Sequence, residues 1–171
     1  MTATYSFNKA LEQQIKDHLW RVADDYKPPL HTYVDIDEYA KKLASSAIRL
    51  EYFSGENLIG LMAGYYNVEK QFLFITNFSL ERVHRGQGME LVVGLLRFLS
   101  GDHKNISPEI QKIGSQILTV LAEDTAPRKP VVKTIHTEVR NDNQKLISFY
   151  EKLGFKIDKI QDESTYLIID L

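Results

Sequence analysis

The first quarter of the chain carries hydrophobic residues at helical spacing in two places. Apolar positions three or four residues apart predict helices over residues 8–23 and 37–47. Between them, Pro28 and Pro29 fix the backbone and lack amide donors, so we expect residues 24–35 to form a loop.

Strand-like patterns follow directly. Residues 48–53, 58–68 and 72–80 are rich in aliphatic and aromatic side chains, and turn-like breaks separate them. The breaks are short enough for hairpins, so the three runs predict an antiparallel meander.

Two further helices are predicted after the meander. The one that begins near Met89 is apolar on both sides, which is typical of a central helix. Ser107, Pro108 and Glu109 suit an N-cap, a first helical position and a first-turn acid, so a second helix should begin there and end before residues 126–130. The remaining predicted elements are a strand over residues 131–139, a helix over 142–153 and a short strand over 166–169.

Composition narrows the class of protein. With 171 residues, of which 43% are hydrophobic, the chain can bury one full core, so residues 1–171 are expected to form a single domain. A net charge of -2 offers no basic stripe for nonspecific nucleic-acid binding, and without cysteine there is no disulfide or thiolate nucleophile. The N-terminus lacks a signal-peptide core and no apolar run is long enough to cross a bilayer, so we expect a soluble, cytoplasmic protein without a membrane partner.

The stretch RGQGME, residues 85–90, lies where a predicted strand turns into the central helix. Glycines let a ligand approach the main chain closely, and the first amides of a helix have no internal partner, so this turn suits an anion such as phosphate. A glycine turn without a ligand is the alternative. The chain has neither the GK[ST] ending of a P-loop nor a full GxGxxG after a first strand, which argues against nucleoside triphosphatase and dinucleotide folds.

A second segment, NDNQKLISFYEKLGF, follows at a suitable distance. Together the two segments resemble the GNAT superfamily of acyl-CoA-dependent N-acyltransferases, whose motifs are [RQ]xxGx[GA] and Nxx[AL]IxxYxKxGF. The matching residues are Arg85, Gly88, Asn143, Leu146, Ile147, Tyr150, Lys152, Gly154 and Phe155. The resemblance covers about residues 58–155 and implies an α/β (α+β) fold with a mixed central sheet flanked by helices. Glu90 departs from the motif, and the helix after the central one is extra.

The resemblance also implies how acetyl-CoA would be held as co-substrate. The turn amides would bind its pyrophosphate; they belong to Arg85, Gly86, Gln87, Gly88, Met89 and Glu90. The backbone of Phe78 and Leu80 would pair with the pantetheine arm as an added strand does, and Asn143 would contact the cofactor through its side-chain amide. Asn143 equally suits a helix cap.

Tyr150 is the catalytic residue that the resemblance implies. Its hydroxyl would lie by the sulfur, where a phenol can donate a proton to the leaving thiolate. Tyr150 also belongs to a helix face suited to burial, so a role in the core is the alternative.

The acceptor side is less defined by sequence. By analogy with the family, its walls would come from residues 26–35 and from Tyr65, Tyr66 and Asn67. The histidines show no metal-ligand spacing, so we expect no metal site.

The expected function is therefore transfer of an acetyl group from acetyl-CoA to a primary amine of a small molecule by direct attack. Two alternatives stay open: a protein N-acetyltransferase, and a non-catalytic CoA-binding module. Assembly as a homodimer is also left open.

The strand over residues 72–80 carries no acid, although many family members have one there as the base. Glu81 follows just beyond it. We therefore predict that no single carboxylate is the base, and that the proton leaves through water held by Thr76, Asn77 or Ser79, or that the amine arrives neutral.

Overall fold

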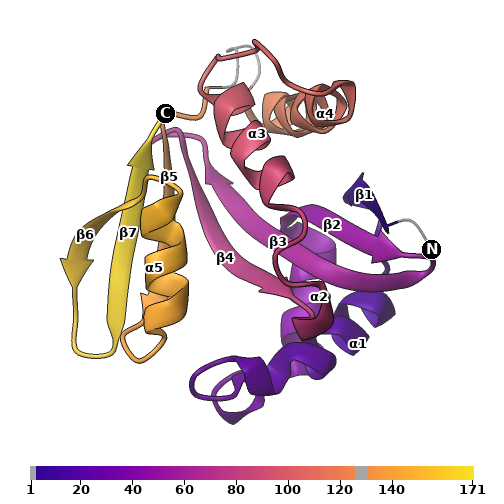
Figure 1. Cartoon of the computed structure of the whole chain (residues 1–171), viewed down its shortest axis with the longest axis vertical. Coiled ribbons are helices and arrows are strands. Elements are labelled where there is room, and N and C mark those ends of the chain that lie inside the picture. Colours follow the sequence, from indigo (N-terminus) through magenta and orange to yellow (C-terminus); the bar gives the residue numbers. More distant parts are fainter. Residues whose placement is uncertain (1–2, 126–130) are drawn as a thin grey trace.

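A seven-stranded sheet, in the order β1-β2-β3-β4-β5-β7-β6, forms the centre of the molecule (Figure 1). It is taken from a computed structural model, which describes residues 3–125 and 131–171. The strands are β1 (Ala3–Phe7), β2 (Ile48–Ser54), β3 (Asn57–Asn67), β4 (Phe72–Leu80), β5 (Thr134–Arg140), β6 (Lys156–Ile160) and β7 (Ser164–Asp170). The helices are α1 (Glu12–Val22), α2 (Ile36–Ser46), α3 (Met89–Leu99), α4 (Pro108–Thr125) and α5 (Gln144–Lys152), with short 3-10 turns η1 (Ala23–Asp25), η2 (Leu30–Thr32) and η3 (Arg82–His84).

The predicted fold class is confirmed, with a mixed sheet flanked by helices and an additional helix, α4, after the central one. Two strands, β1 and β6, were not predicted, and β5 begins at Thr134, three residues later than expected. The expected break at residues 126–130 lies outside the described residues.

The sheet changes direction between β4 and β5. β1 to β4 pair antiparallel, as do β5, β7 and β6, whereas β4 and β5 are parallel. Their ladder is short: Phe72–Ile75 pairs with Thr134–Thr137, and within the described residues no ladder joins the two strands beyond it. Figure 1 shows β4 diverging from β5 and α5 towards its C-terminal end.

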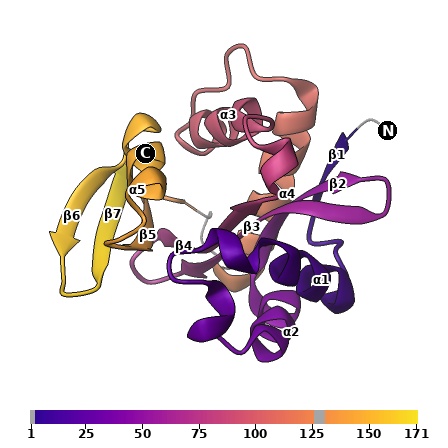
Figure 2. The same cartoon turned by 60° about the horizontal axis from the view of Figure 1, so that its bottom comes forward.

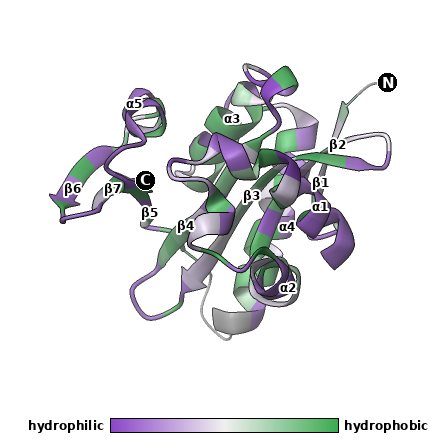
Figure 3. Cartoon of the chain, turned by 90° about the horizontal axis from the view of Figure 1, so that it is seen from below, coloured by the Kyte–Doolittle hydropathy of each residue, from purple (hydrophilic) through white to green (hydrophobic). Residues whose placement is uncertain are grey.

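Helices cover both faces of the sheet. α1 and α2 lie on one face, where Leu19 and Leu43 pack with Leu58 of β3. α3, α4 and α5 contribute to a second core on the opposite face, around Leu95 and Ile147. Figure 2 shows α3 and the α1–α2 pair on opposite sides of β3. In Figure 3, α3 is largely hydrophobic, whereas α1 is mostly hydrophilic.

The additional helix α4 docks closely on α3. A side chain at Gly94 of α3 would collide with Ile110, and one at Gly114 of α4 would collide with the Phe98 ring. The two glycines therefore allow an approach that any larger residue would prevent. Among the described residues, no helix is both long enough and apolar enough to cross a membrane.

A buried ion pair fixes α1 and α2 to the sheet. Glu51 is fully buried and accepts hydrogen bonds from the backbone amides of Lys9 and Ala10 at 2.8 and 2.9 Å, just before α1. Arg49 donates to Glu51 at 3.1 Å and to the carbonyl of Leu43, near the end of α2, at 2.9 Å. Because these groups are hydrogen-bonded, the buried charges position both helices.

Candidate active site

The divergence of β4 from β5 leaves a row of backbone groups exposed to a cleft. The amide of Glu81 donates to Ile59 of β3 at 2.9 Å, so alternate residues back along the strand also direct their backbone groups towards β3. Phe78 and Leu80 then direct theirs towards the split, where no described strand pairs with them. An extended ligand can add there as a strand does.

The predicted glycine turn lies at the open end of this split. Gly86 and Gly88 have φ values of 88° and 76°, a left-handed conformation that glycine adopts without strain. The carbonyl of Gly88 accepts the first helical hydrogen bonds of α3, from Leu91 at 3.1 Å and Val92 at 3.3 Å. The turn therefore ends at the N-terminus of a full-length helix.

The structure distinguishes the six turn amides from one another. Those of Arg85 and Gln87 donate within the turn, to Arg82 at 3.3 Å and to His84 at 3.1 Å. The other four donate to no described residue; they belong to Gly86, Gly88, Met89 and Glu90. These four are available to an anion, which the N-terminal end of a helix favours electrostatically.

A stacked pair of tyrosines lies against the glycine turn. Tyr5 stacks on Tyr52 with ring centroids 4.6 Å apart, and a Cβ on Gly88 would lie only 3.3 Å from the Tyr5 hydroxyl oxygen. The Tyr52 hydroxyl donates to Gln87 Oε1 at 3.2 Å. Burial raises the pKa of Tyr5 to about 12, and the neighbouring Tyr52 adds to the shift. Sequence reasoning missed Tyr5 because it missed β1, and it placed Tyr52 in a strand without linking it to the turn.

Two arginines of this region are anchored to η1. Asp25 accepts a hydrogen bond from Arg82 at 2.5 Å and forms an ion pair with Arg85 at 2.8 Å, and its side chain is only 13% exposed. The Arg85 guanidinium is therefore held by a carboxylate. Glu90, the departure from the family motif, is exposed in the first turn of α3, where an acid stabilises a helix.

Tyr150 lies inside the split on α5. It is only 2% exposed and packs against Phe78 and Phe155, with ring centroids at 6.2 and 5.1 Å. Burial raises its pKa well above the usual range, while hydrogen bonding with the Thr137 side chain opposes the shift. The phenol is therefore protonated at neutral pH and can donate a hydrogen bond. Both interpretations of Tyr150, as core residue and as donor, are compatible with this position.

Asn143 caps the helix that carries Tyr150. Its Oδ1 accepts from the Leu146 amide at 3.3 Å, which gives it the structural role considered from sequence. Its Nδ2 donates to no described residue, so the side-chain amide group is available to a ligand. β4 and β5 run parallel, which places Asn143 at the same edge of the sheet as the glycine turn.

A row of hydrogen-bonded polar side chains lies on the face of β4 that α1 and α2 cover. The Tyr26 hydroxyl donates to Asn77 Oδ1 at 2.6 Å, and Asn77 Nδ2 donates to Ser79 Oγ at 3.0 Å. Ser79 Oγ lies 2.8 Å from Nε2 of His18. The tautomer of His18 decides which of these two atoms donates the hydrogen bond.

His18 and Glu81 lie at the end of this row of polar side chains. His18 is fully buried, and burial, with help from the positive charge of Arg21, lowers its pKa to about 4. Glu81 receives a hydrogen bond from Arg21 at 2.6 Å and lies 3.9 Å from His18 Nδ1. The carboxylate is therefore already paired. No sequence signal pointed to His18 beyond its place on an amphipathic helix.

The sequence matches no family model, and no curated protein is significantly similar to it. Solved structures are similar in fold. A Bacillus subtilis acetyltransferase in complex with CoA has a TM-score of 0.57 at 15% identity, covering 99% of each chain. A GNAT-family acetyltransferase from Streptococcus pneumoniae has a TM-score of 0.54 at 11% identity, covering 98% of this chain and 99% of that one. The Escherichia coli ribosomal-protein-S18-alanine N-acetyltransferase has 0.56 at 13% identity, covering 99% and 94%.

The chain has the GNAT fold. At these identities the likeness concerns the fold, and the roles of single residues in this GNAT-like chain depend on its own geometry.

Of the residues expected to line the acceptor side, two lie away from the split and one lies beside it. Tyr66 donates to the Val131 carbonyl at 2.6 Å, and Asn67 accepts from the Lys70 amide in the β3–β4 turn at 2.8 Å, so neither reaches the split. Tyr33 does reach it, because the Arg140 guanidinium of β5 lies 5.4 Å from its ring centroid.

Metal ligands and histidines do not gather near the split. Within residues 3–125 and 131–171, no three His, Asp or Glu side chains form a group that could hold a metal ion. His31 lies 3.8 Å from Asp24, and His136 is 2.9 Å from the Thr134 hydroxyl, in separate parts of the molecule. The site is therefore built from backbone groups, phenols and amides.

Proposed function

We propose that this protein is an acyltransferase that moves an acetyl group from acetyl-CoA to a primary amine of a small molecule. The observation that carries the proposal is the split between β4 and β5, where no strand of the described residues pairs with Phe78 and Leu80 on the side facing away from β3. Its open end carries four free turn amides, and its interior carries a protonated phenol. The Bacillus subtilis neighbour, which holds CoA, supports the same choice of donor.

The donor would bind along the whole split. The amides of Gly86, Gly88, Met89 and Glu90 would hold the pyrophosphate at the N-terminus of α3. The pantetheine arm would add to β4 through the backbone of Phe78 and Leu80. The Nδ2 group of Asn143, at the same edge of the sheet, would donate to it. This arrangement brings the thioester towards Tyr150.

Transfer would then proceed by direct attack. The amine nitrogen attacks the thioester carbon, the carbon–sulfur bond breaks, and the departing thiolate takes a proton or hydrogen bond from the Tyr150 hydroxyl. Because burial raises the pKa of Tyr150, the phenol stays protonated at neutral pH and would act by donating a hydrogen bond to the sulfur. The amine loses one proton and the sulfur gains one, so the overall reaction is balanced.

The proton from the amine would leave on the face opposite α3. Tyr26, Asn77 and Ser79 offer an ordered row of hydrogen-bonding groups there, which can hold water. Glu81 is a poor base for this purpose because Arg21 pairs with it. No single carboxylate would therefore remove the proton from the amine.

A small acceptor fits the acceptor face better than a protein chain. The Arg140 guanidinium lies over the Tyr33 ring, so the loop that follows η2 would contact β5 beside the acceptor. A protein N-acetyltransferase is the second candidate, since the Escherichia coli neighbour acts on a ribosomal protein.

Calorimetry tests donor binding directly. The protein should bind CoA in preference to ATP and NAD, and Gly88→Asp should abolish CoA binding, because it adds a side chain and a negative charge where the phosphates approach. Gly101→Asp is the matched control: Gly101 also has a positive φ, of 87°, but lies in the turn after α3. Equal affinity for NAD would overturn the proposal.

Thiol release on mixing with acetyl-CoA tests the reaction. A panel of small amines should elicit release, whereas a response to peptides alone would favour the second candidate. CoA binding without release for any acceptor would leave a non-catalytic CoA-binding module.

A further inference from the structure

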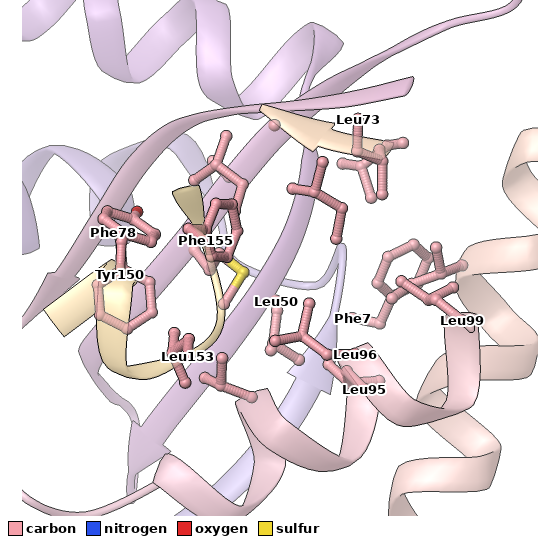
Figure 4. A pocket seen from close by; sticks show the side chains of 18 residues that line it. Phe7, Leu50, Leu73, Phe78, Leu95, Leu96, Leu99, Tyr150, Leu153 and Phe155 are labelled. Carbon is pink, nitrogen blue, oxygen red and sulfur yellow. The ribbon is translucent and has the colours of Figure 1, made fainter. Parts of the chain in front are cut away.

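An apolar cavity of about 80 Å³ lies between α3 and the sheet (Figure 4). Eighteen of the described residues line it: fifteen lie on α3, α4, α5 and strands β2 to β5, and the others are Phe7 of β1 and Leu153 and Phe155, which follow α5. Tyr150 carries the only oxygen among their side chains, and Met62 carries the only sulfur. The interior is therefore a hydrocarbon environment.

The cavity begins at the split and extends away from it. Figure 4 shows Phe78 and Tyr150 at one end, and Phe7 and Leu99 at the other, under the C-terminal part of α3. The proposed thioester position by Tyr150 is thus continuous with the apolar space. The glycine turn lies at the opposite, N-terminal end of α3.

Neither water nor ordinary packing accounts for such a space. An empty apolar cavity destabilises a fold, and protein interiors are otherwise close-packed. Water needs two to four polar partners, and among the lining side chains of the described residues only that of Tyr150 carries an oxygen. A cavity of about 150 Å³ is known to bind benzene, so a volume of about 80 Å³ holds roughly three or four methylene-sized groups.

We propose that the cavity receives the hydrocarbon chain of an acyl-CoA donor whose acyl group has about four to six carbons. The proposal rests on the proposed function, because the chain would reach the cavity from a thioester held in the split. The reaction is unchanged, since the amine still attacks the thioester carbon and releases CoA. Only the transferred group becomes longer than acetyl.

Chain length should decide affinity. Burying one methylene completely is worth about fourfold in affinity, so calorimetry should show hexanoyl-CoA binding at least about tenfold tighter than acetyl-CoA. The gain should stop at about six carbons, beyond which the chain exceeds the cavity. Equal dissociation constants across the series would overturn the inference while leaving CoA binding, and hence the proposed function, intact. Failure of CoA and all its thioesters to bind would overturn both.

Two tryptophan substitutions on α3 test whether the cavity, and not the exposed surface of the helix, determines the preference for chain length. Leu99→Trp would fill the far end, so the hexanoyl-to-acetyl affinity ratio should fall below about twofold. Val93→Trp adds the same side chain at a position that is 40% exposed, and the ratio should stay at the wild-type value. A wild-type ratio in folded Leu99→Trp would contradict the inference. If circular dichroism shows Leu99→Trp unfolded, Leu73→Phe fills the cavity from β4 and must meet the same expectation.

Discussion

Both faces of the sheet bury apolar side chains, but they differ in the polar groups buried with them. Under α1 and α2, charged and polar groups are buried but paired, as in Arg49–Glu51 and the row from Tyr26 to His18. Under α3 and α5, the buried groups are almost entirely apolar, and they leave an open volume. Hydrogen bonds fix direction, whereas apolar contacts do not.

The difference shows how one sheet can serve both partners of a reaction. A face whose geometry is fixed by paired polar groups suits an acceptor that must be oriented and deprotonated. A face without polar groups suits a hydrocarbon that only needs space. Tyr150 is the exception on the apolar face, and His18 is the most deeply buried titratable group of the polar row.

The largest effect is expected at Tyr150, the one hydroxyl of the apolar lining. Tyr150→Phe keeps the ring but removes the proton donor, so kcat should fall by about 10²-fold or more, or about 2.7 kcal/mol of barrier. Steady-state kinetics with an accepted amine measure this. Tyr166→Phe, which removes a hydroxyl from β7, is the control. An unchanged kcat with a lowered Tm would return Tyr150 to a packing role.

An intermediate effect is expected at His18, from pH. Its pKa is about 4 when folded and about 6.5 in an unfolded chain, so the unfolded state binds the proton more tightly. Stability due to the neutral histidine is complete above pH 6.5 and is lost as the pH falls towards 4. Between pH 7 and pH 5 the loss should be about 2 kcal/mol.

Urea unfolding of wild type and His18→Gln at both pH values isolates this contribution. Glutamine can still hydrogen-bond Ser79 but does not titrate, so the variant should lose about 2 kcal/mol less than wild type over this interval. Equal losses in the two proteins would show that His18 is not kept neutral by its surroundings.

The smallest effect is expected at Glu81, on the rim of the polar face. Glu81→Gln should change kcat/KM by less than about twofold, and stability by less than about 1 kcal/mol, because Arg21 is 41% exposed. The pH profile of kcat/KM should rise towards the pKa of the amine itself. A loss of about 10²-fold at unchanged CoA affinity would instead identify Glu81 as the base.

Hydrophobic patterns in the sequence predicted the helices and the inner strands of the sheet. They did not predict the two edge strands, β1 and β6. The residues of β6 are all exposed, so no alternation of burial marks the strand. β1 does alternate, with Tyr5 and Phe7 between polar residues, but its pairing with β2 spans more than 40 residues and no local pattern indicates it.

The same distinction applies to the site. The glycine turn and Tyr150 lie in short local motifs and could be located from sequence. Tyr5, His18 and Asp25 reach the site from other parts of the chain, through β1, α1 and η1. The cavity depends on volumes contributed by several elements, which no motif encodes.

The short ladder between β4 and β5 also bears on how the chain folds. Phe72 pairs with Thr134, 62 positions later, whereas β2, β3 and β4 are joined by tight hairpins. Contacts between distant segments require more loop entropy to be lost and tend to form after local ones. The meander should therefore assemble early, and the arrival of β5 beside β4 should come late. Since the split exists only once that ladder has formed, binding competence should be among the last properties the folding chain acquires.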